Sequence, residues 1–243
     1  MARRKGFFEF KHFSIQQRHA AMKVGTDSDL LGTLSQGGNR ILDVGTGTGV
    51  LSLMLAQRYP LASITAVEID ENAIIDATAN FAASPMGERI ELLHTSFQDY
   101  LAQALEQGRA ESYDAVVCNP PYFDQSLECP DEGRTRARHS SSLPFDVLAC
   151  GAYKLLTPGG VFSVCIPPEV LTKFKGECQL AGFSLQDLYK IKTLPQQDVK
   201  RLVLVMKKTT SVTPREHNCV MLNEDRSRSP WYREIMRDFL LNM

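Results

Sequence analysis

A glycine-rich junction between an apolar run and a helical pattern constrains this chain more than any other feature. The run Arg40–Val44 is followed by Gly45, Gly47 and Gly49, and residues 50–59 then carry apolar side chains at helical spacing. Glycine lets the backbone turn tightly and lets a ligand approach the main chain closely. The start of the helix adds backbone N–H groups to the same place. Nucleotide-binding folds of several kinds share this pattern, so it predicts a ligand site without identifying the ligand.

The rest of the chain alternates short apolar runs with helical patterns. Strands that alternate with helices favour a mostly parallel sheet covered by helices on both faces. The segments 185–191 and 202–206 have no long helix between them, which predicts an antiparallel pair. A last helix over 231–241 is expected to dock on the core. The other predicted strands are 40–44, 64–69, 90–93, 113–118 and 161–166, and the other helices are 50–59, 72–83, 100–106, 145–156 and 168–180.

A carboxylate follows the glycines by about twenty residues, the spacing found in dinucleotide-binding folds. Glu68 closes the second predicted strand, and Ile69 and Asp70 come next. Ligands of open α/β sheets bind at the carboxyl ends of the strands. Glu68 is therefore expected to accept hydroxyl hydrogens of a ribose and Ile69 to cover an adenine, whereas Asp70 suits the cap of the next helix. These features alone do not separate a dinucleotide enzyme from a methyltransferase.

The sequence Asn119-Pro120-Pro121-Tyr122 at the end of the fourth predicted strand separates the two. A proline after Asn119 disfavours helical conformation there and keeps the turn rigid. The side-chain oxygen of Asn119 and the carbonyl of Pro120 then form two convergent acceptors. Such a pair suits an NH2 group on a planar system, namely adenine N6, guanine N2 or a glutamine amide. Tyr122 supplies a flat face for stacking on that plane. The motif therefore predicts methyl transfer to nitrogen.

The segment 43–49, Glu68 and the segment 119–122 together resemble the class I methyltransferases that carry an Asn-Pro-Pro-Tyr motif. Over nearly its whole length the chain is similar to the bacterial tRNA1(Val) adenine-N6 methyltransferase family, notably in residues 22–27 (MKVGTD), 30–32 (LLG) and 117–123 (VCNPPYF). The resemblance implies a Rossmann-like α/β fold, with a mostly parallel seven-stranded sheet and a C-terminal antiparallel strand. It also implies one methyltransferase domain over 1–243. In that domain a basic N-terminal arm and helix (1–39) precede a cofactor-binding core with the C-terminal helix (40–243).

S-adenosyl-L-methionine is the cofactor that the resemblance implies, and the adenine 3′ of the anticodon is the methyl acceptor. One position departs from the family, in which an acidic residue often follows the third strand and reaches the cofactor's adenine. Spacing places Ser96 there, with Asp99 slightly further on. The resemblance assigns methyl transfer to Asn119, Pro120 and Tyr122, and cofactor binding to Asp43, Gly45, Gly47, Gly49, Glu68, Ile69, Ser96 and Asn119.

The net charge of −1 means that tRNA would have to bind a local basic patch. The first 26 residues carry six basic side chains against Glu9 alone, which fits either RNA contact or a solvated arm. A second group of basic residues follows the Asn-Pro-Pro-Tyr motif. It fits either contact with RNA phosphates or a solvated loop. More distant candidates lie on helix faces and strand edges. The candidates outside the first 26 residues are Arg134, Arg136, Arg138, His139, Lys173, Lys175, Lys190, Lys192, Lys200 and Arg201.

Three other functions stay open at this point. A protein glutamine-N5 methyltransferase would use the same motif, but that family usually has a helical substrate-binding domain before the glycine turn, and only 42 residues precede Asp43. An rRNA adenine-N6 or guanine-N2 methyltransferase is excluded less well. A non-catalytic cofactor-binding module is the third, and the intact Asn119 and Tyr122 speak against it.

The chain carries no signature of a membrane or metal partner. No apolar run reaches the length of a membrane span. The basic N-terminus lacks the apolar stretch and cleavage site of a secretory signal. Six scattered cysteines form no Cys-x-x-Cys pair, so no zinc site is predicted. We therefore expect a cytoplasmic protein with reduced cysteines.

Overall fold

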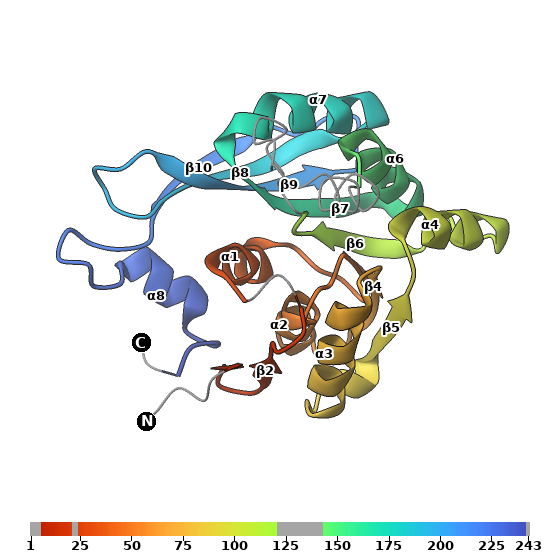
Figure 1. Ribbon diagram of the computed structural model, residues 1–243. Helices are drawn as coiled ribbons and strands as arrows, with labels where there is room; N and C mark the ends of the chain where they lie inside the picture. The colour runs from red at the N-terminus through yellow and green to blue at the C-terminus, as the bar shows by residue number, and fades with distance from the viewer. Residues whose placement is uncertain (1–5, 21–23, 121–142, 242–243) are drawn as a thin grey trace, which may run out of the picture.

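An eight-stranded sheet with helices on both faces forms the core of the chain (Figure 1). The computed structural model describes residues 6–20, 24–120 and 143–241. The strand order is β10-β8-β9-β7-β6-β3-β4-β5, and β9 alone runs antiparallel to its neighbours. The strands are β3 (Arg40–Val44), β4 (Ser63–Glu68), β5 (Ile90–His94), β6 (Tyr113–Cys118), β7 (Leu156–Ile166), β8 (Ser184–Lys192), β9 (Val199–Lys207) and β10 (Arg215–Val220).

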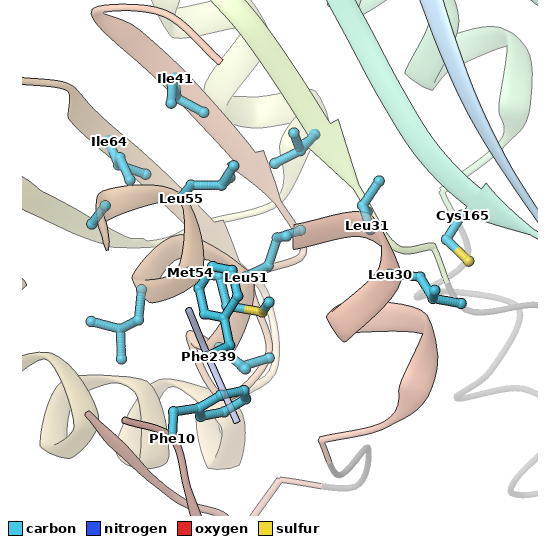
Figure 2. Close-up of a cluster of buried hydrophobic side chains, with 14 of the residues drawn as sticks. Phe10, Leu30, Leu31, Ile41, Leu51, Met54, Leu55, Ile64, Cys165 and Phe239 are labelled. Atoms are coloured by element: carbon cyan, nitrogen blue, oxygen red, sulfur yellow. The ribbon is translucent and has the colours of Figure 1, made fainter. Parts of the chain in front are cut away.

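Two apolar layers hold the helices against the sheet. One layer packs α1, α2, α3 and α8, and the other packs α4, α6 and α7 (Figure 1). In the first layer, Leu31 of α1, Leu55 of α2 and Ile41 of β3 meet in one buried cluster with Phe239 (Figure 2). The helices are α1 (Thr26–Leu34), α2 (Val50–Arg58), α3 (Glu71–Ala82), α4 (Phe97–Glu106), α6 (Phe145–Leu155), α7 (Leu171–Ala181) and α8 (Pro230–Met236), with 3-10 turns η1 (Gly87–Arg89) and η2 (Pro168–Val170).

The predicted fold class is confirmed, with corrections at several element boundaries. Helix α4 begins at Phe97 rather than residue 100, because Ser96 caps it by accepting from the Asp99 backbone N–H. Strand β7 begins at Leu156, five residues before the predicted strand 161–166. The helix expected over 168–180 divides into η2 and α7, and the last helix ends at Met236 rather than near residue 241. Among the described residues, no helix combines the length and apolar character that a bilayer crossing requires.

The strand count corrects the seven-stranded expectation, because β10 adds an eighth strand at the edge. Its residues are mostly polar, so the sequence pattern does not predict it. Strand β10 lies parallel to β8 and is anchored by Asp187, which is 1% exposed. Arg215 donates two hydrogen bonds to this carboxylate at 2.8 and 2.7 Å, and His217 Nε2 lies 2.8 Å from it. Side-chain pairing therefore supplies what the apolar pattern lacks.

This anchor makes stability depend on pH. Burial alone would raise the pKa of Asp187, but the hydrogen bonds from Arg215, His217 and Gln186 hold it below its ordinary value. Since the folded pKa lies below the unfolded one, the stabilisation is complete above the unfolded pKa and is lost as pH falls through the folded pKa. We expect Asp187→Asn to lower the free energy of unfolding at pH 7 by about 1–3 kcal/mol.

Urea denaturation of wild type and Asp187→Asn at several pH values checks this expectation. The difference between them should narrow below about pH 4, where the unfolded carboxyl binds its proton. Glu224→Gln, an exposed acid in the loop after β10, is the matched control and should leave stability unchanged. A difference that stays constant down to pH 3.5 would mean that charge at Asp187 does not stabilise the fold.

The N-terminal stretch is not a solvated arm over residues 6–20. It forms the hairpin β1 (Phe7–Glu9) and β2 (Ser14–Gln16), and Ile15 is fully buried. Two buried polar side chains of α3 hold it in place. Asn80 Oδ1 accepts from the Gln16 backbone N–H at 2.7 Å, and Asp76 Oδ2 accepts from the backbone N–H groups of His19 and Ala20. The apolar residues between the basic ones therefore dock this stretch on the helical layer.

Candidate active site

The carboxyl ends of β6, β3, β4 and β5 meet at one edge of the sheet. Val44 at the end of β3 lies level with Val67 of β4 and with Cys118 of β6, and Glu68 lies level with His94 of β5. The residues that follow these strands, or end them, are therefore brought together. They include the glycine turn, Glu68, Ser96, Asn119 and Pro120, which the sequence predicts as site residues. Ligands of open α/β sheets bind at this edge.

The three glycines of the turn have different surroundings. Gly45, Gly47 and Gly49 all have positive φ, at 70°, 58° and 82°. A Cβ atom added at Gly45 or Gly47 would meet nothing within 4 Å, whereas one at Gly49 would lie 2.4 Å from the ring of Phe81 in α3. The first two glycines therefore leave the backbone open to a ligand, and the third lets α2 and α3 pack.

Alanine substitutions should separate these two roles. An alanine Cβ at Gly47 would touch no neighbouring atom but would occupy space that we assign to the ligand. Gly47→Ala should therefore leave the protein folded and weaken ligand binding about tenfold. The αL backbone itself costs about 1 kcal/mol for alanine. Gly49→Ala adds overpacking against Phe81 and should lower the free energy of unfolding by about 2–4 kcal/mol. Thermal unfolding and ligand titration of both variants check this, and equal losses of stability at the two positions would contradict it.

Asp43 lies beneath the turn and is fully buried. Its Oδ2 accepts from the hydroxyls of Thr46 and Ser52, both at 2.7 Å. Its Oδ1 is buried and has no hydrogen-bond partner among the described residues. Burial raises the pKa of Asp43 to about 6, and the charge of Glu68 adds to this, while the two hydroxyls partly offset it. A buried carboxylate with an unsatisfied oxygen favours a ligand that carries positive charge.

Glu68 is held by the backbone around the turn. Its Oε2 accepts from the Gly47 N–H at 2.8 Å, and its Oε1 accepts from the N–H groups of Ile69 and Asp70 at 2.8 and 2.9 Å. A carboxylate offers about four acceptor positions, so one remains on Oε2 for a ligand hydroxyl. Ile69 is 52% exposed, an unusual exposure for a large apolar side chain that suits the cover of a flat ring.

Ser96 serves the fold as the cap of α4. Its Oγ accepts from the Asp99 N–H at 3.0 Å and donates to Asp99 Oδ2 at 2.6 Å. The hydroxyl hydrogen is thus used, but the structure places the exposed Asp99 carboxylate directly beside the serine. The predicted acceptor position after the third strand is therefore a Ser96–Asp99 pair, and its role toward a ligand stays a prediction.

Asn119 receives a partner that the sequence pattern does not predict. Its Nδ2 donates to the hydroxyl of Ser28, in the first turn of α1, at 3.4 Å. Pro120 is buried next to it. Ser28 lies between residues 22–27 and 30–32, which the sequence analysis singles out by family resemblance alone. That resemblance does not predict a contact with Asn119. Five residues that the sequence analysis singles out lie outside the described residues, namely Tyr122, Arg134, Arg136, Arg138 and His139.

In the described ranges, no three His, Cys, Asp or Glu side chains are grouped so that they could hold an ion. The chemistry at this edge is instead that of hydrogen-bond acceptors: two carboxylates, the amide of Asn119 and the carbonyl of Pro120.

Known proteins resemble the chain in sequence. Residues 19–132 match the family model "Methyltransferase small domain". A tRNA1(Val) (adenine(37)-N6)-methyltransferase of Phocaeicola vulgatus is 40% identical, covering 98% of each chain. The protein of the same name from Bacteroides fragilis is 38% identical over 98% of each chain, and that from Vibrio vulnificus is 36% identical over 97% of this chain and 96% of its own.

Solved structures resemble the chain in fold. A predicted O-methyltransferase from Agrobacterium tumefaciens superposes with a TM-score of 0.69 at 20% identity, covering 88% of this chain and 96% of that one. A T. thermophilus 16S rRNA N2 methyltransferase, solved with AdoMet and guanosine, gives a TM-score of 0.56 at 20% identity, covering 84% of this chain and 50% of that one. Both likenesses concern the fold.

Proposed function

The chain belongs to the tRNA1(Val) (adenine(37)-N6)-methyltransferase family, and we propose that the edge of the sheet formed by β6, β3, β4 and β5 is its active site. The protein is an S-adenosyl-L-methionine-dependent methyltransferase that methylates N6 of adenine 37 in tRNA1(Val). The observation that carries the site assignment is the alignment of the glycine turn, Glu68 and Asn119 at one edge. We also propose that the chain acts as one methyltransferase domain, in the cytoplasm, where tRNA is present.

The described residues fit the cofactor. The open backbone at Gly45 and Gly47 gives it room, and the unsatisfied oxygen of Asp43 suits its positive charge. Glu68 has one acceptor position for a ribose hydroxyl, so binding both hydroxyls requires the Gly47 N–H to give way. Ile69 would cover the adenine of the cofactor, and the amino group of that adenine would donate a hydrogen bond to Ser96 or Asp99. Gly49 would contribute to the cofactor site by shaping the turn, and Asn119 by bordering it.

The cofactor supplies a methyl group that its sulfonium already activates. An adenine amino group is a poor nucleophile, because its lone pair is delocalised into the ring. Asn119 Oδ1 and the Pro120 carbonyl would accept hydrogen bonds from the two N–H groups of the adenine amino group. These contacts would favour a pyramidal nitrogen and stabilise the positive charge that develops on it. Stacking on Tyr122 would fix the distance and angle of attack. The proton would then leave through the same acceptors to water, so no dedicated base is required.

We place the tRNA on the same edge, with the anticodon loop over Asn119. An unpaired loop base can leave its stack at lower cost than a base in a duplex. Strand β8 runs parallel to β6, so Lys192 at its end lies at this edge, as does the exposed Lys200 near the start of β9. Lys190 is already paired with Glu216, and Arg201 with Asp27. The local basic surface would therefore use Lys192 and Lys200. Arg134, Arg136 and Arg138, which lie outside the described residues, are proposed as further phosphate contacts.

Methyl transfer from labelled S-adenosyl-L-methionine to tRNA from a strain that lacks the gene tests the function. Nucleoside mass spectrometry and fragment mapping should place N6-methyladenosine at position 37 of tRNA1(Val). Release factors and ribosomal RNA, incubated in parallel, test the glutamine-N5 and rRNA alternatives. Label in either of those, with none in tRNA, would overturn the proposal.

A further inference from the structure

Helix α1 brings a hydroxyl group to the asparagine that we propose as catalytic. Ser28 Oγ lies 3.4 Å from Asn119 Nδ2 and accepts its hydrogen bond, although the two residues are 91 positions apart. Ser28 is not a residue that the fold needs as a cap, since Gly25 is the N-cap of α1 and Ser28 lies inside its first turn. Capping of α1 therefore does not explain the contact, and we consider what it does for Asn119.

An asparagine amide has two unlike ends of nearly equal size. Only Oδ1 can accept an N–H of the target amino group, because Nδ2 is a donor. A half-turn about the Cβ–Cγ bond would exchange the two ends and present N–H groups to the target. A serine hydroxyl can accept from Nδ2 or donate to Oδ1, and in the structure it accepts, so Nδ2 is the end of the amide that Ser28 holds. We propose that Ser28 is a positioning residue, which holds Asn119 Oδ1 toward the target amino group by accepting from Nδ2.

Helix α1 is well placed to act as a rigid support for this hydroxyl. Leu30 and Leu31 are fully buried, and they point from α1 toward the sheet, with Cys165 of β7 beside Leu30 (Figure 2). Asp27, next to Ser28, is paired with Arg201 of β9. One end of the Ser28–Asn119 contact is therefore fixed by the buried face of α1 and by an ion pair, and the other follows β6. A neutral hydroxyl also adds no charge beside the nitrogen that becomes positive.

The test compares Ser28→Ala with a matched substitution on the same helix. The inference rests on the proposed function, so wild-type methylation of adenine 37 is measured first. Loss of one hydrogen bond that is as long as 3.4 Å predicts that Ser28→Ala lowers kcat about two- to fivefold. The KM values for tRNA and S-adenosyl-L-methionine should stay within about twofold, and the melting temperature should not change. Ser28→Thr keeps a hydroxyl and should recover most of kcat.

Ser35→Ala is the control, because Ser35 lies at the other end of α1 and its buried Oγ has no hydrogen-bond partner among the described residues. It should leave kcat unchanged. A second readout uses the Asn119→Asp background. A carboxylate has two acceptor ends and no orientation to choose, so Ser28→Ala should cost little further there.

The outcomes separate the two proposals. If the wild type methylates adenine 37 and Ser28→Ala keeps full kcat, or loses activity only through KM or unfolding, the positioning role is wrong and the proposed function stands. If the wild type methylates release factor or ribosomal RNA instead, the proposed substrate is wrong, and the same kcat comparison on the true substrate still decides the role of Ser28.

Discussion

Replacing Asn119 with alanine is expected to lower kcat for methylation of adenine 37 by about 10²–10³-fold, the usual cost of losing one preorganised polar contact to the reacting group. The reason is specific to an amino group whose lone pair is delocalised. Without Oδ1, one N–H bond has no acceptor, and the developing positive charge loses its nearest stabilising dipole. The Pro120 carbonyl remains, so a residual rate above background is expected.

Single-turnover methylation at saturating cofactor measures this change, and calorimetric titration of S-adenosyl-L-methionine measures any loss of binding. The dissociation constant should change far less than kcat, because the turn and Glu68 hold most of the cofactor. Asn39→Ala is a suitable control, since Asn39 is exposed and immediately precedes β3, at the opposite edge of the sheet. A loss that appears entirely in cofactor binding would move Asn119 from the acceptor site to the cofactor site.

The parts of this site that the sequence predicts are those set by strand ends. Gly45, Glu68 and Asn119 each lie just past or at the end of an apolar run, and parallel strands bring such ends together. Pattern alone therefore places them at one edge. Ser28 could not be found this way, because its contact with Asn119 depends on how α1 packs against β7 and β9, and the two residues are 91 positions apart.

The fold follows the same division. Strands with continuous apolar runs, such as 113–118, agree with the structure, because burial on both faces leaves a clear signal. Strand β10 leaves none, since Asp187 binds its polar side chains and replaces apolar packing with hydrogen bonds. For the basic N-terminal stretch, the sequence suggests less packing than the structure has. Its charges suggest solvation, but Ile15 is buried, and Asn80 and Asp76 satisfy the backbone that docking would otherwise leave unpaired.

Glu68→Gln is expected to weaken binding of S-adenosyl-L-methionine by about 10- to 100-fold, because hydrogen bonds to a charged acceptor contribute roughly 1.5–3 kcal/mol each. The carboxylate carries three backbone N–H groups and has one position left on Oε2. A glutamine offers a single oxygen, and its amide nitrogen would face either the N–H groups of Ile69 and Asp70 or the Gly47 N–H together with the ribose. One of these partners must therefore be lost, whichever way the amide turns.

Titration of S-adenosyl-L-methionine and S-adenosylhomocysteine should give similar losses for this variant, because both carry the ribose that Glu68 is proposed to bind. At saturating cofactor, kcat should fall only a few-fold, which separates Glu68 from Asn119. Glu71→Gln is the matched control, since Glu71 is exposed in the first turn of α3, three residues further on. If only S-adenosyl-L-methionine bound more weakly, Glu68 would act through its charge on the sulfonium and not through hydrogen bonds to the ribose.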